Sequence, residues 1–218
     1  KLMYYESGKH QEEGITHSPL YHLVVPRPIA WISTRIGTHT NLAPMSYFTV
    51  VRDRHPEMIA FCVGHRGHAH ARLGWRWNAP KDTITLVKQT GVFCVNFVDP
   101  PHLEAMVNSA KNCGPEVSEA EEFGIEMADC RLINCSRVAT APASLECEVW
   151  DIIDLPKTVE ATDHHLVIGK VLSHWVSDDI IQNGTIHYQS VGRLGGDEYC
   201  TEWNEVTRVR PDRHKKEV

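Results

Sequence analysis

The sequence has no long apolar run, no internal repeat and no low-complexity linker in its 218 residues. No stretch approaches the ~20 apolar residues that a membrane-spanning helix needs, so we expect no membrane protein. A basic excess is also missing, because the net charge is -6 and the isoelectric point is about 6.2. Nucleic-acid-binding proteins usually carry a basic stripe, so we expect no nucleic-acid partner. Hydrophobic residues at 42% and charged residues at 23% predict a globular protein.

Paired cysteine motifs are absent. The seven cysteines are an odd number, and no two of them form a C-x-x-C motif. Most lie in apolar runs such as residues 93–95, where a free cysteine behaves as a small hydrophobe. This pattern predicts a reducing compartment, and we expect a cytoplasmic protein. The chain begins at Lys1 rather than Met, so a preceding targeting segment stays open.

Helix patterns are few and strand patterns dominate. Bulky and β-branched residues predict strands at residues 29–34, 47–51, 58–63, 92–98, 145–153 and 166–176. Short helices are predicted at residues 83–90, 101–108 and 118–123. Asp82 is the expected N-cap of the first helix and Gly91 its stop, while Ser118 and Glu121 have the spacing of a capping box. Many short strands favour a barrel or sandwich, and the lack of regular strand–helix alternation argues against a parallel doubly wound sheet.

Three segments carry residues suited to holding a ligand. The first is a strand end at residues 26–34, followed by a proline-bent segment at 41–48 in which Pro44 is expected to interrupt strand pairing. The second is 81–83, where a lysine and a threonine flank a helix start that could bind phosphate. The third is 192–199, where two adjacent glycines permit close approach of a flat ligand. Each segment alone is equally typical of a turn, a helix cap or a loop.

Taken in order, these segments resemble the flavin reductase-like proteins, which are FMN-binding split β-barrels. The resemblance is carried by P-R-P-I-A-W-I-S-T, N-L-A-P-x-S-Y-F, K-D-T, T-G-V-F-x-V-N and G-R-L-G-G-x-E-Y, from about Val24 to Tyr199. It implies a mainly β protein, an antiparallel split β-barrel with a few short peripheral helices. We treat 1–218 as a single domain, with the motif-bearing core at about 20–200 and a C-terminal arm or tail at 201–218.

The resemblance also implies where the FMN cofactor binds. Its phosphate would be held by two strand-end hydroxyls and by the segment that starts the first helix, and its ring would lie along the segment at 41–48 and near the glycine turn. The residues implied are Trp31, Ile32, Ser33, Thr34, Asn41, Ala43, Pro44, Ser46, Phe48, Lys81, Asp82, Thr83, Arg193, Leu194 and Gly195. No side chain need act as an acid or a base, so no catalytic residue is predicted.

The family norm is an NAD(P)H:flavin oxidoreductase that transfers hydride to FMN and sometimes supplies a monooxygenase partner. Two alternatives stay open. One is an enzyme that keeps FMN and reduces a small organic substrate, and the other is an FMN-binding electron carrier without catalysis. The sequence does not separate NADH from NADPH. The resemblance implies a homodimer, and we expect exposed apolar strands such as residues 166–171 to form its interface.

Residues 64–78 depart from the family pattern, with three histidines, three arginines and two tryptophans. One interpretation is a lid that selects the second substrate through His65, Arg66, Trp75 and Trp77. The alternative is an unspecialised surface loop. His65, His68 and His70 lack a cysteine or carboxylate to complete a metal set, so we predict no metal.

Overall fold

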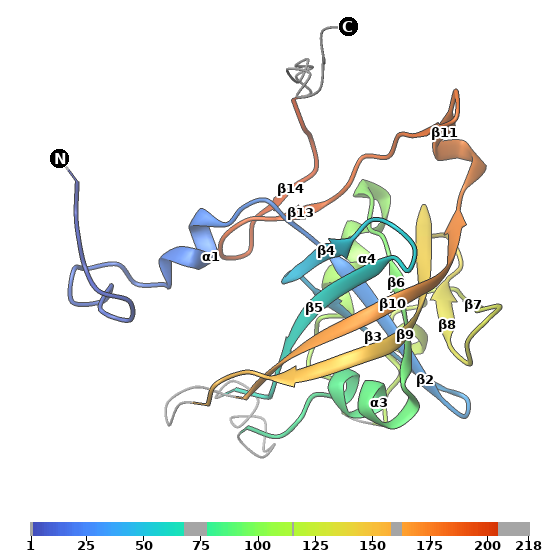
Figure 1. Cartoon of the computed structure of the whole chain (residues 1–218), viewed down its shortest axis with the longest axis horizontal. Coiled ribbons are helices and arrows are strands. Elements are labelled where there is room, and N and C mark those ends of the chain that lie inside the picture. Colours follow the sequence, from blue (N-terminus) through green and yellow to red (C-terminus); the bar gives the residue numbers. More distant parts are fainter. Residues whose placement is uncertain (1, 68–77, 115, 158–162, 205–218) are drawn as a thin grey trace, which may run out of the picture.

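The computed structural model describes residues 2–67, 78–114, 116–157 and 163–204 (Figure 1). Its body is one seven-stranded sheet in the order β3-β2-β6-β9-β10-β5-β4, and every neighbouring pair is antiparallel. These strands are β2 (Ala30–Ile36), β3 (His39–Met45), β4 (Phe48–Arg52), β5 (Met58–Gly64), β6 (Val92–Asn96), β9 (Ala143–Asp154) and β10 (His164–Val176). Contacts between β3 and β5 bring the two ends of the sheet toward each other. The predicted mainly β, antiparallel architecture is confirmed.

The remaining elements are short and lie around this sheet. The helices are α1 (Pro19–Leu23), α3 (Asp82–Thr90), η1 (Pro100–His102), α4 (Leu103–Asn108), α5 (Glu119–Glu122) and η2 (Asp178–Ile180). The short strands are β1 (Arg27–Pro28), β7 (Met127–Asp129), β8 (Ser136–Val138), β11 (Ile181–Gln182), β12 (Thr185–Ile186), β13 (Gly192–Arg193) and β14 (Tyr199–Cys200). The segment that carries α1 extends away from the body (Figure 1). No helix in the described parts of the chain is long and apolar enough to cross a membrane.

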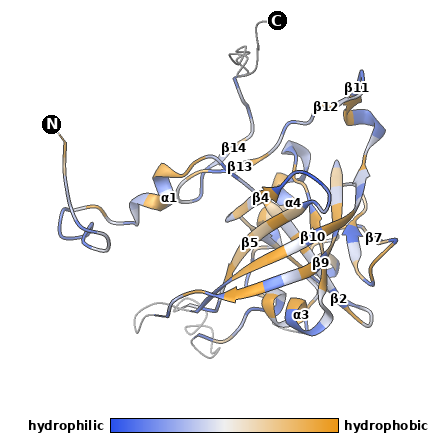
Figure 2. Ribbon diagram, in the orientation of Figure 1, coloured by the Kyte–Doolittle hydropathy of each residue, from blue (hydrophilic) through white to orange (hydrophobic). Residues whose placement is uncertain are grey.

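The sheet separates two apolar clusters. Inside the curve, Phe61 and Phe93 pack edge to face with ring centroids 5.2 Å apart. The second cluster contains Trp31 and Leu42 from β2 and β3, together with Met106 of α4. Apolar residues follow the strands, whereas the turn between β4 and β5 is hydrophilic (Figure 2). Because both faces of β2 are covered, five successive residues of this strand, 30–34, are buried.

Several local predictions need correction. The helix begins at Asp82, so Lys81 rather than Asp82 is its N-cap, while Gly91 ends it in the left-handed conformation at φ 71°, as predicted. Ser118 forms no capping box, because its buried hydroxyl donates to the carbonyl oxygen of Thr40 at 2.7 Å. Pro44 does not interrupt strand pairing. Pro44 lies within β3, opposite Trp31 of β2. Because β3 is an edge strand, it tolerates a residue without a backbone N–H.

Candidate functional site

Two adjoining pockets lie between the end of β3, the start of α3 and the chain after α4. The Lys81 pocket measures about 140 Å³ and is lined by Asn41, Ala43, Pro44, Met45, Arg66, Lys81, Asp82, Thr83, Ser109, Ala110, Lys111, Asn112, Cys113 and Glu119. The Arg193 pocket measures about 360 Å³ and is lined by Tyr21, Ile29, Pro44, Ser46, Lys81, Met106, Ala110, Arg193 and Tyr199. Pro44, Lys81 and Ala110 line both, so the two pockets meet. Their combined size suits a small-molecule site.

The Lys81 pocket is built on a buried polar contact between β3 and α3. The side-chain amide of Asn41 donates to the hydroxyl of Thr83 at 3.1 Å and, more weakly, to that of Thr34 at 3.4 Å. All three residues are buried. Thr83 lies in the first turn of α3, where backbone N–H groups have no partner within the helix and the helix dipole is positive. The pocket therefore offers hydrogen-bond donors to an anion.

The charges around this pocket are of both signs. Arg66 forms an ion pair with Asp82 at 2.8 Å, and the same guanidinium donates to the carbonyl oxygen of Pro80. Burial, together with the neighbouring Arg66, lowers the pKa of Lys81 below its ordinary value. Glu119 accepts a hydrogen bond from the backbone N–H of Leu42 at 3.0 Å, and burial raises the pKa of its carboxyl group. One carboxylate is thus neutralised by an arginine, and the other is shifted toward its neutral form.

The Arg193 pocket combines a cation with aromatic rings. The guanidinium of Arg193 lies over the ring of Tyr199, 4.5 Å from its centroid, and donates to the hydroxyl of Tyr21 at 3.4 Å. Tyr21 belongs to α1, and Arg193 to β13, which pairs with β1. Buried Arg27 ties these segments together, because it donates to the carbonyl oxygens of Tyr21 and Leu194 at 2.8 and 2.9 Å. The N-terminal segment that carries α1 and the hairpin formed by β13 and β14 therefore meet at this pocket.

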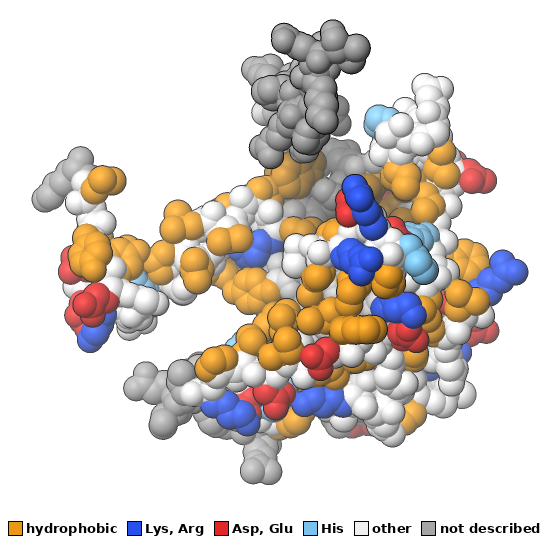
Figure 3. All heavy atoms as spheres, in the orientation of Figure 1, with side chains coloured by type: hydrophobic (Ala, Val, Ile, Leu, Met, Phe, Trp, Pro, Cys, Tyr) orange, Lys and Arg blue, Asp and Glu red, His pale blue; other side chains and the backbone are white. Residues whose placement is uncertain are grey.

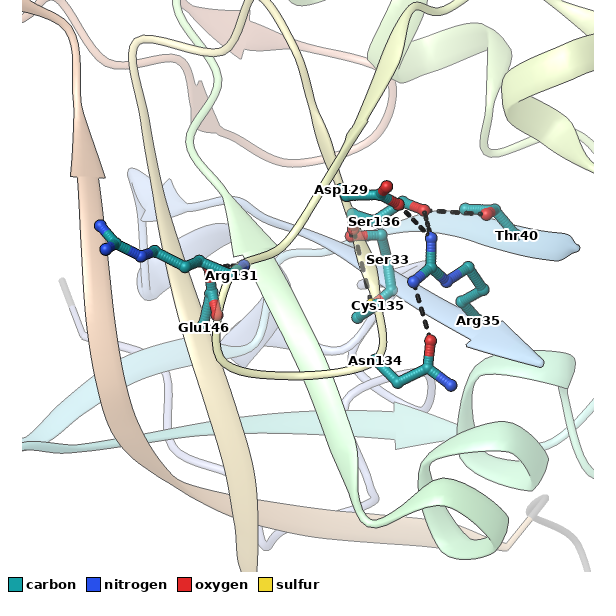
Figure 4. A network of polar contacts seen from close by, with 9 residues as sticks. All are labelled: Ser33, Arg35, Thr40, Asp129, Arg131, Asn134, Cys135, Ser136 and Glu146. Carbon is teal, nitrogen blue, oxygen red and sulfur yellow. Dashed lines mark hydrogen bonds and ion pairs between the residues drawn. The ribbon is translucent and has the colours of Figure 1, made fainter. Parts of the chain in front are cut away.

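Ser33 lies in a different network, beneath the hairpin between β7 and β8 (Figure 4). Its hydroxyl donates to the carbonyl oxygen of Ser136 at 2.6 Å and accepts from the amide of Asn96 at 3.1 Å. Near the hairpin, Arg35 donates to Asn134 at 2.8 Å and pairs with Asp129 (Figure 4). The Ser33 side chain thus fastens the hairpin to β2 and does not line either pocket.

The structure brings together about half of the cofactor residues implied by the resemblance. The residues that line the pockets are Asn41, Ala43, Pro44, Ser46, Lys81, Asp82, Thr83 and Arg193. The residues that line neither pocket are Trp31, Ile32, Ser33, Thr34, Phe48, Leu194 and Gly195. Trp31 is buried and donates from its indole to Ser109, and Ile32 lies in the apolar interior. Thr34 contributes indirectly, through Asn41. The assignment of all of them to the cofactor remains a prediction.

Of the four residues assigned to a second substrate, only Arg66 and His65 belong to the described residues, and they lie in different surroundings. Arg66 lines the Lys81 pocket, whereas the His65 ring contacts His165 and Asn78. Trp75 and Trp77 lie outside the described residues, as do His68 and His70, so the lid interpretation stays a prediction. Within the described ranges, no group of three His, Cys, Asp or Glu side chains is arranged to hold a metal.

Sequence reasoning missed one wall of each pocket. The segment 109–113 and Glu119 line the Lys81 pocket, and Tyr21 lines the Arg193 pocket. The run of small and polar residues after a predicted helix was the only available signal for 109–113. Tyr21 gave none, because it lies 172 residues before Arg193 in the sequence.

Comparison with known proteins decides the family. The sequence model of the Flavin reductase like domain matches residues 21–193, most of the chain. The chain belongs to the flavin reductase-like family. An uncharacterized protein of Aquifex aeolicus is 33% identical over 189 residues, which cover 84% of this chain and 88% of that protein.

Several solved structures have the same fold. Nitrilotriacetate monooxygenase component B from Bacillus cereus superposes with a TM-score of 0.82 at 24% identity, covering 95% of this chain and all of that one. The 2-nitrobenzoate 2-nitroreductase NbaA from Pseudomonas fluorescens has a TM-score of 0.76 at 24% identity and covers both chains fully. A putative flavin reductase with split barrel domain from Shewanella frigidimarina has a TM-score of 0.71 at 18% identity, covering 96% of this chain and 99% of that one, which confirms the split-barrel fold. Family membership makes the protein a flavin-related oxidoreductase.

Proposed function

We propose that this flavin reductase-like protein binds FMN across the Lys81 and Arg193 pockets and uses it to oxidise NADH or NADPH. The observation that carries the proposal is the Asn41–Thr83 hydrogen bond beside Lys81 at the start of α3. Buried donors, a cation and a helix N-terminus together favour a phosphate group. The acidic neighbours are compatible with it, because Arg66 neutralises Asp82 and burial raises the pKa of Glu119.

The two pockets would bind different parts of FMN. Lys81 and Thr83 would hold the phosphate, and Pro44 and Ser46 would position the ring at the junction and beyond it. When bound, FMN would supply a ring that accepts a hydride from the nicotinamide. Arg193 lies at the far end, where its fixed positive charge would stabilise the negative charge on a reduced flavin. Of the residues the resemblance implies, Ser33 would then act only through the backbone or through its support of β2.

A steady-state assay tests this proposal and separates it from an electron carrier. The purified protein is given FMN and then NADH or NADPH, and oxidation of the nicotinamide is followed as free FMN is increased. A rate that rises with free FMN is the expected result for a flavin reductase. Tight retention of FMN without any nicotinamide oxidation would indicate the carrier and refute the proposed activity.

A second candidate is direct reduction of a small aromatic substrate. Two tyrosines and Arg193 line a pocket large enough for a planar anion, and one solved relative in fold is a nitroreductase. Stacking and a guanidinium suit such a compound. Turnover of a nitroaromatic acid at constant bound FMN, without any dependence on free FMN, would favour this function. A monooxygenase partner, suggested by the other relative, would instead require release of reduced flavin.

We also propose a homodimer, with an interface different from the one the sequence suggested. Val167 and Val171 of β10 are buried in the core, so residues 166–171 are not an exposed apolar strand. Exposed apolar side chains lie instead on the edge strand β4, where Val50 is 63% exposed, and on α1, where Leu23 is 75% exposed. An uncovered apolar edge strand favours self-association. Apolar side chains also gather along the N-terminal segment that carries α1 (Figure 3).

Light scattering tests the dimer. The expected mass is twice the 24.7 kDa of the chain, and the charged variant Val50→Lys should shift it toward the monomer. A single-chain mass for the unmodified protein at micromolar concentration would contradict the proposal.

We further propose a cytoplasmic location, because seven free cysteines suit a reducing compartment.

A further inference from the structure

Two histidines contact each other beside the segment that joins β5 to α3, which we call the connection. His65 follows β5, and His165 is the second residue of β10, which pairs with β5. Their Nε2 atoms are 2.8 Å apart, and their ring centroids 4.9 Å. His165 is only 5% exposed. At that distance one ring must donate a hydrogen to the other.

The neighbour of His65 determines which ring donates. Nδ1 of His65 lies 2.8 Å from the carbonyl oxygen of Asn78, which can only accept, so Nδ1 carries a hydrogen. In the neutral ring Nε2 is then an acceptor, and the donor is Nε2–H of His165. Because the chain of hydrogen bonds ends on a carbonyl oxygen, it cannot pass a proton onward. Its role is therefore to orient the His65 ring.

The other side of His165 faces a carboxylate. Its Nδ1 lies 2.6 Å from Oδ1 of Asp154 on β9 and 3.5 Å from Nζ of Lys88 on α3. The nearby Asp163 is paired with Lys157 at 2.7 Å. Burial lowers the pKa of His165, and Asp154 opposes that shift. At 2.6 Å from a carboxylate oxygen, Nδ1 must carry a hydrogen and donate to Asp154. A His165 ring that also donates from Nε2 to His65 therefore carries a hydrogen on both nitrogens, and its positive charge faces the Asp154 carboxylate.

The His65 ring lies where the two ends of the connection are joined. The N–H of Arg66 donates to the carbonyl oxygen of Ala79 at 2.8 Å, and the N–H of Asn78 donates to that of Arg66 at 2.9 Å. The Arg66 side chain then reaches Asp82 at the Lys81 pocket. Because His65 holds the Asn78 carbonyl, the ring adds a third link between the two ends.

We propose that His165 is a positioning residue: it donates to His65, which holds the two ends of the connection together and so fixes Arg66 at the Lys81 pocket. This inference rests on the proposed function, since it assigns Arg66 a place beside the phosphate of bound FMN. His165 itself touches neither pocket.

The test compares two substitutions of His165 with a control on the same strand. His165→Met keeps the volume without a donor, whereas the amide nitrogen of His165→Gln can replace Nε2–H. His174→Met is the control, because His174 is half exposed and lies near Glu57. For His165→Met we expect FMN affinity to fall about fivefold to tenfold relative to riboflavin, the equivalent of one hydrogen bond. His165→Gln should restore the ratio, and the control should leave it unchanged.

Nitrogen NMR of the flavin-free protein provides a readout that loss of packing alone would not move. His65 should carry its hydrogen on Nδ1 in the unmodified protein, and in His165→Met the Nε2 resonance of His65 should move to the position of an acceptor without a hydrogen bond. A hydrogen on Nε2 of His65 in the unmodified protein would overturn the proposal, as would an unchanged FMN-to-riboflavin ratio in His165→Met. Failure of the unmodified protein to bind either flavin would overturn the proposed function, while the His65 signal would still decide the direction of the hydrogen bond.

Discussion

Replacing the two phosphate-binding candidates at the start of α3 should separate FMN from riboflavin. The variants are Lys81→Met, which keeps the chain length without the charge, and Thr83→Val, which keeps the shape without the hydroxyl. Lys81 faces both pockets, and the Thr83 hydroxyl accepts from Asn41 at 3.1 Å, so its hydrogen can donate to a phosphate oxygen. Riboflavin has the same ring and ribityl chain but no phosphate, so it reports any general damage to the pocket.

The size of the effect follows from the kind of hydrogen bond lost. A hydrogen bond to a charged group contributes about 1.5–3 kcal/mol, which corresponds to roughly 10–150-fold in affinity. We therefore expect Lys81→Met to weaken FMN by that factor and riboflavin by less than about twofold. Thr83→Val removes one hydroxyl and deprives the Asn41 amide of its nearer acceptor, so its effect on FMN should be smaller. Because both residues would contact one phosphate, the two effects should not be additive.

Quenching of flavin fluorescence on binding measures both ligands in the same assay. Lys170→Met is the matched control, because Lys170 pairs with Glu148 at 2.7 Å and lines neither pocket. Equal losses for FMN and riboflavin in Lys81→Met would refute the placement of the phosphate. So would an FMN affinity that the substitution leaves unchanged.

Three further predictions concern pH and stability. The pKa of Lys81 is lowered, so the preference for FMN over riboflavin should decline as pH rises, and the decline should occur at a lower pH than for a free lysine. Lys81→Arg should abolish that decline, because arginine stays charged, and a flat profile in the unmodified protein would count against the prediction. Asn96→Leu should lower the free energy of unfolding in urea by about 3 kcal/mol or more, because the buried Asn96 amide bonds the backbone of Trp31 and Val138; a loss below about 1 kcal/mol would contradict this. Gly169→Ala should cost about 1–3 kcal/mol, since its Cβ would come within 2.4 Å of the Phe93 ring, and Phe93→Leu in the same chain should recover part of that loss.

The regular parts of the fold could be predicted from the sequence. The run 58–63 and the long run 166–176 are rich in β-branched and aromatic residues, and both form strands close to those bounds. β3 was missed because Pro44 suggested an interruption, whereas an edge strand needs no N–H there. Strand position in the sheet is set by long-range pairing, which a local pattern does not reveal.

The candidate site could be predicted only in part, because short motifs reveal some of its residues while others depend on contacts between distant segments. Asn41, Lys81 and Thr83 belong to short motifs, and the fold brings them together. The Ser33 hydroxyl was assigned to the phosphate, but β2 is covered on both faces, so this side chain is bonded to Ser136 instead. Tyr21 was missed because its place at the Arg193 pocket depends on how the N-terminal segment that carries α1 meets the hairpin of β13 and β14.

A crystal structure of the protein with FMN tests the central claim most directly. The account predicts the phosphate within hydrogen-bonding distance of Lys81 and of the first turn of α3, with the ring beside Pro44 and toward Arg193. Density for FMN elsewhere, with the phosphate away from α3 and both pockets empty, would contradict the account.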